Sequence, residues 1–250
     1  MKIVDTYMEF SRVYDMFMDN IPYDKWHEHI LKLLLEQNIK DGIVADLGCG
    51  TGTMTELLAK SGYDMIGIDS SAEMLEKAMD KRYASGLDGI LYLNQDMCDF
   101  ELYGTVGAII SVCDCINYIL DEEDVKHIFR LVQNYLDFGG VFIFDFTTEK
   151  KYLDIKDVTI AENREDGSFI WENTYYEDEK INEYELTLFL PDGEGKYDKY
   201  CEIHEQRAYT PKEIESYLKE AGLKVLKMSD DYSDDDINED SKRIVVVAQK

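Results

Sequence analysis

The sequence predicts an α/β protein with a Rossmann-like, doubly wound, mostly parallel sheet of seven strands, an N-terminal helical cap and an antiparallel β-insert. Three observations support this fold. An apolar run ending at residue 47 enters a glycine-rich turn and is followed by an amphipathic helical pattern. Apolar runs and helical patterns then alternate up to residue 147, which is typical of a parallel sheet. From about residue 150 to 209 the hydrophobic period becomes two, which favours antiparallel strands.

These patterns divide the chain into three parts. Apolar side chains recur at helical spacing in two groups before the first strand, so two helices are expected there. After the insert, Thr210 and Pro211 open a helix that ends at Gly222, and two final strands flank an acid-rich loop. The expected parts are the helical cap, residues 1–40; the core, residues 41–148 and 210–250; and the β-insert, residues 149–209.

Composition indicates a globular, cytoplasmic protein. With 250 residues, of which 45% are hydrophobic, the chain can bury a full core. Its five cysteines are odd in number and lack the spacing of a disulfide framework, which fits a reducing compartment. The first residues lack an apolar signal region and no run of 18 apolar residues occurs, so no membrane partner is expected.

The net charge of −27 argues against a polyanionic partner. Nucleic-acid affinity depends largely on cationic neutralisation of phosphates, and no Lys/Arg-rich stretch is present, so no nucleic-acid partner is expected. No metal site is predicted either, because Cys113 and Cys115 form a C-x-C without a second pair. The acid-rich loop lacks the ligand spacing of a calcium site and is interpreted as a solvated hairpin tip.

The glycine-rich turn is the first candidate binding motif. A strand, a tight turn and a helix N-terminus meet at residues 44–53, where backbone N–H groups favour an anionic ligand group. A dinucleotide fingerprint wants glycine where Thr53 stands. The stretch instead resembles the first motif of the class I S-adenosylmethionine-dependent methyltransferases. This resemblance implies that Asp46 helps to hold the cationic methionine amine and that Gly48, Cys49 and Gly50 form the turn beside the cofactor.

A second candidate motif is the carboxylate that ends the next strand. Residues 64–69 read as a short buried strand ending in Asp69, 21 residues after Gly48. In a doubly wound fold, an acid at this place accepts both ribose hydroxyls; the alternative is an acidic helix cap. Ser70 and Glu73 are expected to form a capping box for a helix with Met74 on its apolar face. We expect Asp69, Ser70 and Met74 to contact the cofactor.

Two further loops follow the next strands. After the strand at residues 90–93, the resemblance implies that Asp96 accepts from the adenine amino group and that the Met97 backbone N–H reaches the ring. The strand at residues 106–112 runs into a loop that begins with Cys113. Ligands of open α/β sheets bind outside the carboxyl ends of the strands, so this loop should face the transferred methyl group.

The resemblance extends over essentially the whole chain. The order of cap, glycine-loop core, β-insert, helix and terminal hairpin looks like that of a bacterial group of small cytosolic methyltransferases. It implies S-adenosylmethionine as cofactor, contacted also by Tyr14, Trp26 and Cys113. One departure is Cys115, which stands where family members often have Ser or Thr. The matching local stretches are Tyr14-Asp15, Tyr23, Trp26, Asp114, Asn117-Tyr118 and residues 204–207.

Methyl transfer from a sulfonium is an in-line displacement that mainly requires alignment and desolvation of two reactants. A base helps when the acceptor carries a proton, and the candidates are Asp114, His204 and Tyr14. Their alternative roles are, in the same order, a loop cap, a solvent-facing strand residue and core packing.

The acceptor is expected to be a small molecule or a peptide-borne group enclosed by the cap and the insert. Candidate substrate contacts are Asn117, Tyr118 and Arg207, of which Arg207 could hold a carboxylate or form a structural salt bridge. Two alternatives stay open at this stage: a non-catalytic S-adenosylmethionine-binding protein and a nicotinamide-dependent oxidoreductase. The protein is expected to be a monomer or a homodimer.

Overall fold

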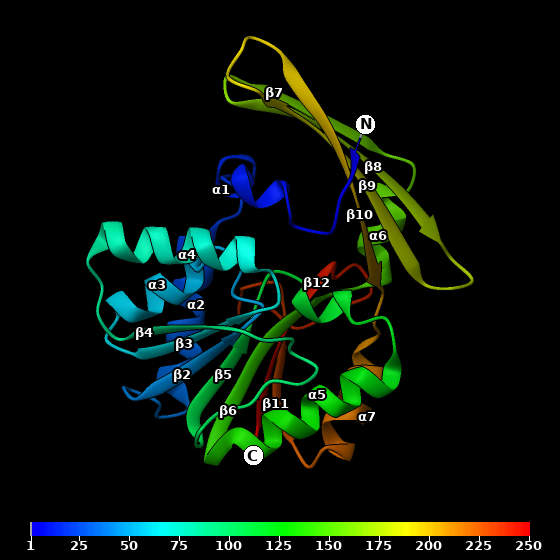
Figure 1. The fold of residues 1–250 in the computed structure, drawn as a ribbon. Coiled ribbons are helices and arrows are strands. Elements are labelled where there is room, and N and C mark those ends of the chain that lie inside the picture. The colour runs from blue at the N-terminus through cyan, green and yellow to red at the C-terminus, as the bar shows by residue number, and fades with distance from the viewer. Residues whose placement is uncertain (1) are drawn as a thin grey trace.

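The computed structural model describes residues 2–250 and contains two sheets (Figure 1). The larger sheet has seven strands in the order β11-β12-β6-β5-β2-β3-β4, and β12 is antiparallel to both of its neighbours while the other pairs are parallel. This arrangement confirms the predicted doubly wound sheet. Its strands are β2 (Ile43–Leu47), β3 (Asp64–Asp69), β4 (Ile90–Asn94), β5 (Val106–Ser111), β6 (Leu136–Thr147), β11 (Lys224–Asp230) and β12 (Arg243–Gln249).

Helices cover both faces of this sheet because successive strand residues point to opposite sides. Val44 of β2 packs in one core cluster with side chains of α2 and α3, whereas its neighbour Ala45 packs in another with side chains of α5 and α7. Among the described residues no helix is long and apolar enough to cross a membrane. The helices are α2 (Tyr23–Glu36), α3 (Thr53–Lys60), α4 (Ala72–Ser85), α5 (Glu122–Tyr135) and α7 (Pro211–Glu220).

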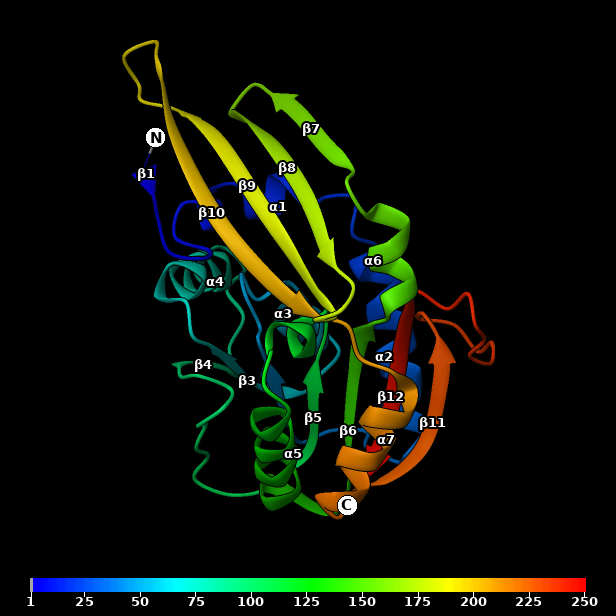
Figure 2. The ribbon, with the colours of Figure 1, turned by 90° about the vertical axis from the view of Figure 1, so that its right-hand side faces the viewer.

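The second sheet lies beyond the carboxyl ends of the parallel strands (Figures 1 and 2). Its order is β1-β10-β9-β8-β7; β1 is parallel to β10 and the remaining pairs are antiparallel. A short helix, α6 (Glu149–Ile155), leads into it from β6. The predicted antiparallel insert is therefore present. Its strands are β1 (Lys2–Ile3), β7 (Thr159–Arg164), β8 (Gly167–Tyr176), β9 (Ile181–Pro191) and β10 (Tyr197–Arg207).

The first of the two expected N-terminal helices is present only as short turns. Residues 2–18 contain β1, a single 3-10 turn at Phe10–Arg12 (η1) and the one-turn helix α1 (Tyr14–Phe17). Their apolar side chains pack on one face of the insert, as when the Phe17 ring lies edge-on to Phe169 with centroids 4.8 Å apart. Short turns are thus sufficient to bury these regularly spaced side chains. They pack against strands of the insert that lie some 150 residues later in the sequence.

Two helix starts were also predicted from capping residues. Thr210 forms the expected capping box, because its hydroxyl accepts from the Glu213 N–H and its own N–H donates to the Glu213 carboxylate. At α4 the prediction is wrong by one residue: Ser71, not Ser70, is the N-cap and accepts from the Met74 N–H. Ser70 instead lines a cavity at the end of β3.

Candidate active site

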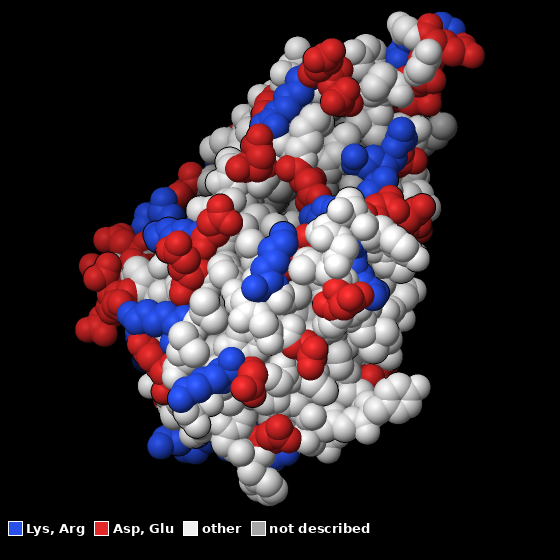
Figure 3. Space-filling view, turned by 90° about the vertical axis from the view of Figure 1, so that its left-hand side faces the viewer, with Lys and Arg blue, Asp and Glu red and all other residues white. Residues whose placement is uncertain are grey.

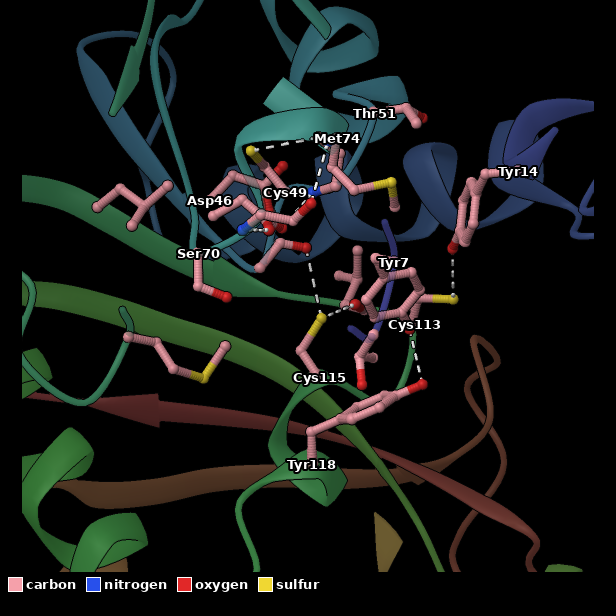
Figure 4. A pocket seen from close by; sticks show the side chains of 18 of the residues that line it. Tyr7, Tyr14, Asp46, Cys49, Thr51, Ser70, Met74, Cys113, Cys115 and Tyr118 are labelled. Carbon is pink, nitrogen blue, oxygen red and sulfur yellow. Dashed lines mark hydrogen bonds between the residues drawn. The ribbon is translucent and has the colours of Figure 1, made fainter. Parts of the chain in front are cut away.

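A cavity of about 540 Å³ lies between the carboxyl ends of the parallel strands and the N-terminal segment (Figure 4). Its size suits a small-molecule or cofactor site. The walls come from residues 5–8, the glycine turn, the end of β3, the loop after β4 and the loop after β5. The sequence-predicted site residues that line it are Tyr14, Asp46, Gly48, Cys49, Gly50, Asp69, Ser70, Met74, Asp96, Met97, Cys113 and Tyr118.

The glycine turn forms the floor of this cavity. Gly48, Gly50 and Gly52 all have left-handed backbone angles, with φ of 74°, 53° and 75°. A Cβ at Gly48 would lie 2.5 Å from the Cys115 Sγ, and one at Gly52 would lie 2.3 Å from the Tyr92 hydroxyl. A side chain at either position would strain the backbone and press on these neighbours, so the tight turn requires glycine there.

Asp46 supplies a buried negative group to the cavity. It is completely buried, and its Oδ2 accepts from the Thr55 hydroxyl at 2.6 Å. Its Oδ1 has no hydrogen-bond partner among the described residues. Burial, with a smaller contribution from nearby Asp69, raises the pKa of Asp46 to about 7. A buried carboxylate oxygen without a partner, at a cavity wall, fits a cationic amine, because a buried charge needs pairing.

Asp69 links two elements at the wall of the cavity. Its carboxylate accepts from the Gly50 N–H at 2.8 Å and from the Ser71 N–H at 2.9 Å, so it joins the glycine turn to the start of α4. Burial raises its pKa, although these backbone hydrogen bonds oppose the shift. A carboxylate has about four lone-pair positions, so the backbone donors leave capacity for a ligand hydroxyl in the cavity.

The loop after β4 completes this side of the cavity. Asp96 accepts from the Cys98 N–H at 2.8 Å, which shapes the loop around it, and Met97 lies beside it at the cavity wall. These residues, with Asp46 and Asp69, place carboxyl groups at or just beyond the ends of three consecutive parallel strands, β2, β3 and β4. This is an arrangement suited to a nucleoside cofactor with a charged amino-acid tail.

The structure places Trp26 elsewhere, which corrects the expectation that it contacts the cofactor. Its ring is 3% exposed and stacks on Tyr232 with centroids 4.5 Å apart. The Arg243 guanidinium covers the ring at 4.9 Å. Both partners come from the C-terminal hairpin, so Trp26 joins α2 to β12 and does not line the cavity.

Asp114 is likewise withdrawn from the cavity. It has a left-handed backbone (φ 61°), and its N–H donates to the fully buried Asp145 at 2.7 Å. Its carboxylate forms an ion pair with Arg243, which also pairs with Asp145. The alternative of a structural loop residue therefore describes Asp114 better than that of a base.

Asn117 and Arg207 also have structural partners in place of substrate contacts. The Asn117 amide, completely buried, donates to the carbonyls of Thr147 and Arg207 and accepts from the Thr147 N–H. The Arg207 side chain donates to the Leu120 carbonyl at 3.1 Å and lies 3.8 Å from the Glu213 carboxylate. Both residues hold the loop after β5 to the end of β10, and neither lines the cavity.

His204 is buried, so its solvent-facing alternative is wrong. It is 2% exposed on β10, with Nε2 3.2 Å from the Glu202 carboxylate and Nδ1 3.3 Å from the Tyr118 hydroxyl. The Tyr118 hydroxyl is 2.6 Å from that of Tyr7, and both phenols line the cavity (Figure 4). The sequence indicated Tyr7 only as part of an aromatic N-terminal cap that could cover a pocket. It did not single out Glu202, whose only signal was its place in an alternating strand pattern.

Tyr14 lines the cavity, as the sequence predicted. Its hydroxyl lies 4.0 Å from the Cys113 Sγ (Figure 4). Burial raises the pKa of Tyr14 well above its ordinary value and that of Cys113 to about 12, so both groups are protonated near neutral pH. Tyr14 alone therefore cannot take a proton from an acceptor, which argues against its expected role as a base.

A polar cluster that the sequence did not reveal ties the N-terminal segment to the glycine turn. The Thr51 hydroxyl donates to the Asp15 carboxylate at 2.5 Å. Lys81 of α4 donates to Asp15 at 2.9 Å and to Thr53 at 2.8 Å. The segment that covers the cavity is therefore fastened to the start of α3.

Comparisons with known proteins give methyltransferases. A family model described as a methyltransferase domain matches residues 44–140. The chain is 35% identical to the Putative methyltransferase YqeM of Bacillus subtilis over 246 residues, covering 98% of this chain and 97% of that protein. The crystal structure of an S-adenosylmethionine-dependent methyltransferase from Clostridium acetobutylicum superposes with a TM-score of 0.86 and 31% identity, covering 97% of this chain and 98% of that one.

The chain belongs to the class I S-adenosylmethionine-dependent methyltransferases. It is an enzyme of that class, with S-adenosylmethionine as its cofactor, so the nicotinamide-dependent and non-catalytic alternatives are set aside. The Asp46 oxygen without a partner and the glycine turn at the cavity wall fit this cofactor: Asp46 would hold the amine, Asp69 the ribose, and Asp96 with Met97 the adenine.

Proposed function

We propose that this enzyme transfers the methyl group to an amine of a small molecule or of a peptide end. The supporting observation is the charge of the cavity: among the described lining residues every charged side chain is a carboxylate, and Lys, Arg and His are absent. An anionic acceptor would be buried there without a cationic partner, which is costly. The carboxylates are Asp5, Asp46, Asp69, Glu73 and Asp96.

The acceptor side of the cavity is aromatic. Four phenols line it, and electron-rich ring faces attract an ammonium group while their hydroxyls hydrogen-bond to it. They are Tyr7, Tyr14, Tyr23 and Tyr118. A more distant relative, 28% identical over 140 residues, is a dTDP-3-amino-3,4,6-trideoxy-alpha-D-glucopyranose N,N-dimethyltransferase of Streptomyces venezuelae. Its name states an amino sugar as acceptor, which agrees with the proposal.

The outer surface argues against a polyanionic partner. The net charge is −27, and on the face shown in Figure 3 the basic side chains are scattered among acidic ones. Salt-dependent binding of nucleic acid requires a basic patch that neutralises several phosphates. We therefore propose that the enzyme has no nucleic-acid partner.

Catalysis then follows mainly from enclosure and alignment. The bound cofactor supplies an electrophilic methyl group on a cationic sulfonium. The protein holds the cofactor along the ends of β2, β3 and β4, and the N-terminal segment covers the cavity and excludes water. Alignment of two reactants in this way contributes on the order of several kcal/mol to lowering the barrier.

The test uses S-adenosylmethionine carrying an isotopically labelled methyl group and a deproteinised small-molecule extract of bacterial cells, followed by mass spectrometry of labelled products. The expected result is a label on nitrogen. A label on a carboxylate or phosphate oxygen, or submicromolar salt-sensitive binding of transfer RNA, would contradict the proposal. A heat-inactivated enzyme sample is the control for spontaneous methylation.

A further inference from the structure

We infer that Tyr7, Tyr118, His204 and Glu202 form a proton relay that takes the proton of the acceptor amine. The inference rests on the proposed function, because an amine that enters as an ammonium ion must lose a proton before its lone pair can attack. The relay runs from the cavity wall into the second sheet. It joins the N-terminal segment, the 3-10 turn Cys115–Tyr118 (η2) and β10, which are distant in sequence.

The carboxylate end of the relay sets the direction of the hydrogen bonds. Glu202 is completely buried and accepts from the backbone N–H groups of Tyr7, Glu9 and Phe10 at 2.8–2.9 Å. Both carboxylate oxygens of Glu202 therefore act as hydrogen-bond acceptors. The His204 Nε2, 3.2 Å from the same carboxylate, must then carry a proton and donate it to the hydrogen bond, which leaves Nδ1 as an acceptor.

The two phenols continue this polarity toward the cavity. Tyr118 donates to the free Nδ1 of His204 at 3.3 Å, so its oxygen accepts from the Tyr7 hydroxyl at 2.6 Å. The Tyr7 oxygen keeps its lone pairs for a donor in the cavity that it lines (Figure 4). Burial raises the pKa of both phenols, so neither stores a negative charge and each passes a proton on.

Proton transfer comes first and methyl transfer second. The ammonium gives one proton to the Tyr7 oxygen while the Tyr7 proton moves to Tyr118 and the Tyr118 proton moves to Nδ1 of His204, which forms an imidazolium beside the Glu202 carboxylate. The neutral amine then attacks the methyl carbon: a C–N bond forms, the C–S bond breaks, and its electron pair stays on sulfur. In this scheme Tyr7 is the catalytic residue, and Tyr118, His204 and Glu202 act through it.

The backbone of Tyr7 supports a specific role for this side chain. Tyr7 has a φ of 63°, in the left-handed region that a bulky residue rarely adopts. Glu202 holds this conformation through the Tyr7 N–H, and the ring packs edge-on to His204 with centroids 4.9 Å apart. Unusual backbone angles that the surroundings maintain are often found at functional positions.

The experiment compares Tyr7→Phe, Tyr118→Phe and His204→Gln with the parent enzyme. Each variant is first checked for S-adenosylmethionine affinity by calorimetry, expected within about twofold of the parent, since none of the three contacts the proposed cofactor groups. The rate of labelled methyl transfer into the same deproteinised extract should then fall about a hundredfold or more. Matched controls are Tyr83→Phe, which is 88% exposed, and His127→Gln on α5; both should retain the parental rate.

A spectroscopic measurement tests the relay without any acceptor. Nitrogen-15 NMR of the imidazole should show Nδ1 of His204 unprotonated, and Tyr118→Phe should shift its resonance. A protonated Nδ1, or transfer rates of both phenylalanine variants within threefold of the parent, would overturn the relay. A labelled oxygen product in the parent enzyme would overturn the amine acceptor instead, so the two failures are distinguishable.

Discussion

Substitution of Asp46 tests the cofactor site directly. Burial of the ionised Asp46 carboxylate lowers the stability of the cofactor-free protein, but the same carboxylate would pair with the cationic amine of the bound cofactor. Its ordinary pKa is 3.8, and in the folded protein burial raises it to about 7. The native state therefore binds a proton between pH 4 and 7 that the unfolded state has lost, so stability falls as the pH rises through this window. Three pKa units correspond to about 4 kcal/mol.

The substitution Asp46→Asn removes this cost. We expect the free energy of unfolding of the cofactor-free variant to exceed that of the parent by about 2–4 kcal/mol at pH 8, and by only about 1 kcal/mol near pH 4.5. In the variant the amide oxygen at position 46 can still accept from the Thr55 hydroxyl, so the packing around this side chain is retained. The exposed Asp88→Asn serves as a control and should change neither quantity.

Cofactor binding should change in the opposite direction. Removing one partner of a buried charge pair costs about 2–4 kcal/mol, so the Kd for S-adenosylmethionine should rise about 30- to 1,000-fold at pH 8. The parent should lose affinity by up to about tenfold per pH unit below pH 7, because the carboxyl must ionise before it holds the amine. The variant should show a much flatter pH profile.

The assays are urea unfolding of the cofactor-free proteins at both pH values and calorimetric titration with S-adenosylmethionine from pH 5.5 to 8. Equal affinity of variant and parent at pH 8 would show that Asp46 does not hold the amine. Unchanged stability at pH 8 would show that burial of the ionised carboxylate is not costly, and the expected pH dependence of binding would then be wrong as well.

Three further predictions follow from the same structure. Asp69→Ala removes a charged acceptor for the ribose and should weaken S-adenosylmethionine binding about ten- to a hundredfold, or about 1.5–3 kcal/mol, in calorimetry; an unchanged Kd would refute the assignment. Phe17→Ala opens a gap between α1 and the second sheet and should reduce the free energy of unfolding by about 3–5 kcal/mol in urea titration, whereas a loss below about 1 kcal/mol would show that the N-terminal segment is not part of the core. Methyl transfer into the deproteinised extract should be unaffected by EDTA, since the displacement needs no Lewis acid; activity lost with EDTA and restored by one metal would contradict this.

Local patterns in the sequence predicted the scaffold and one side of the cavity. The strand, the glycine turn and the helix at residues 43–60 follow from hydrophobic period, positive φ and helix propensity, which depend on neighbouring residues. Asp46 and Asp69 end parallel strands, and the carboxyl ends of such strands share one edge of the sheet. Their place at the cavity therefore followed from their position along the chain.

The acceptor side of the cavity was decided by tertiary structure. The roles of Trp26 and Asp114 depend on Arg243, which is more than 100 residues away in the sequence. Its guanidinium covers the Trp26 ring and pairs with the Asp114 carboxylate. Glu202 meets the backbone of Tyr7 across 195 residues of sequence. Hydrophobic period reports which face of an element is buried, but a partner across the fold depends on strand register and on how the two sheets meet, which local sequence does not encode.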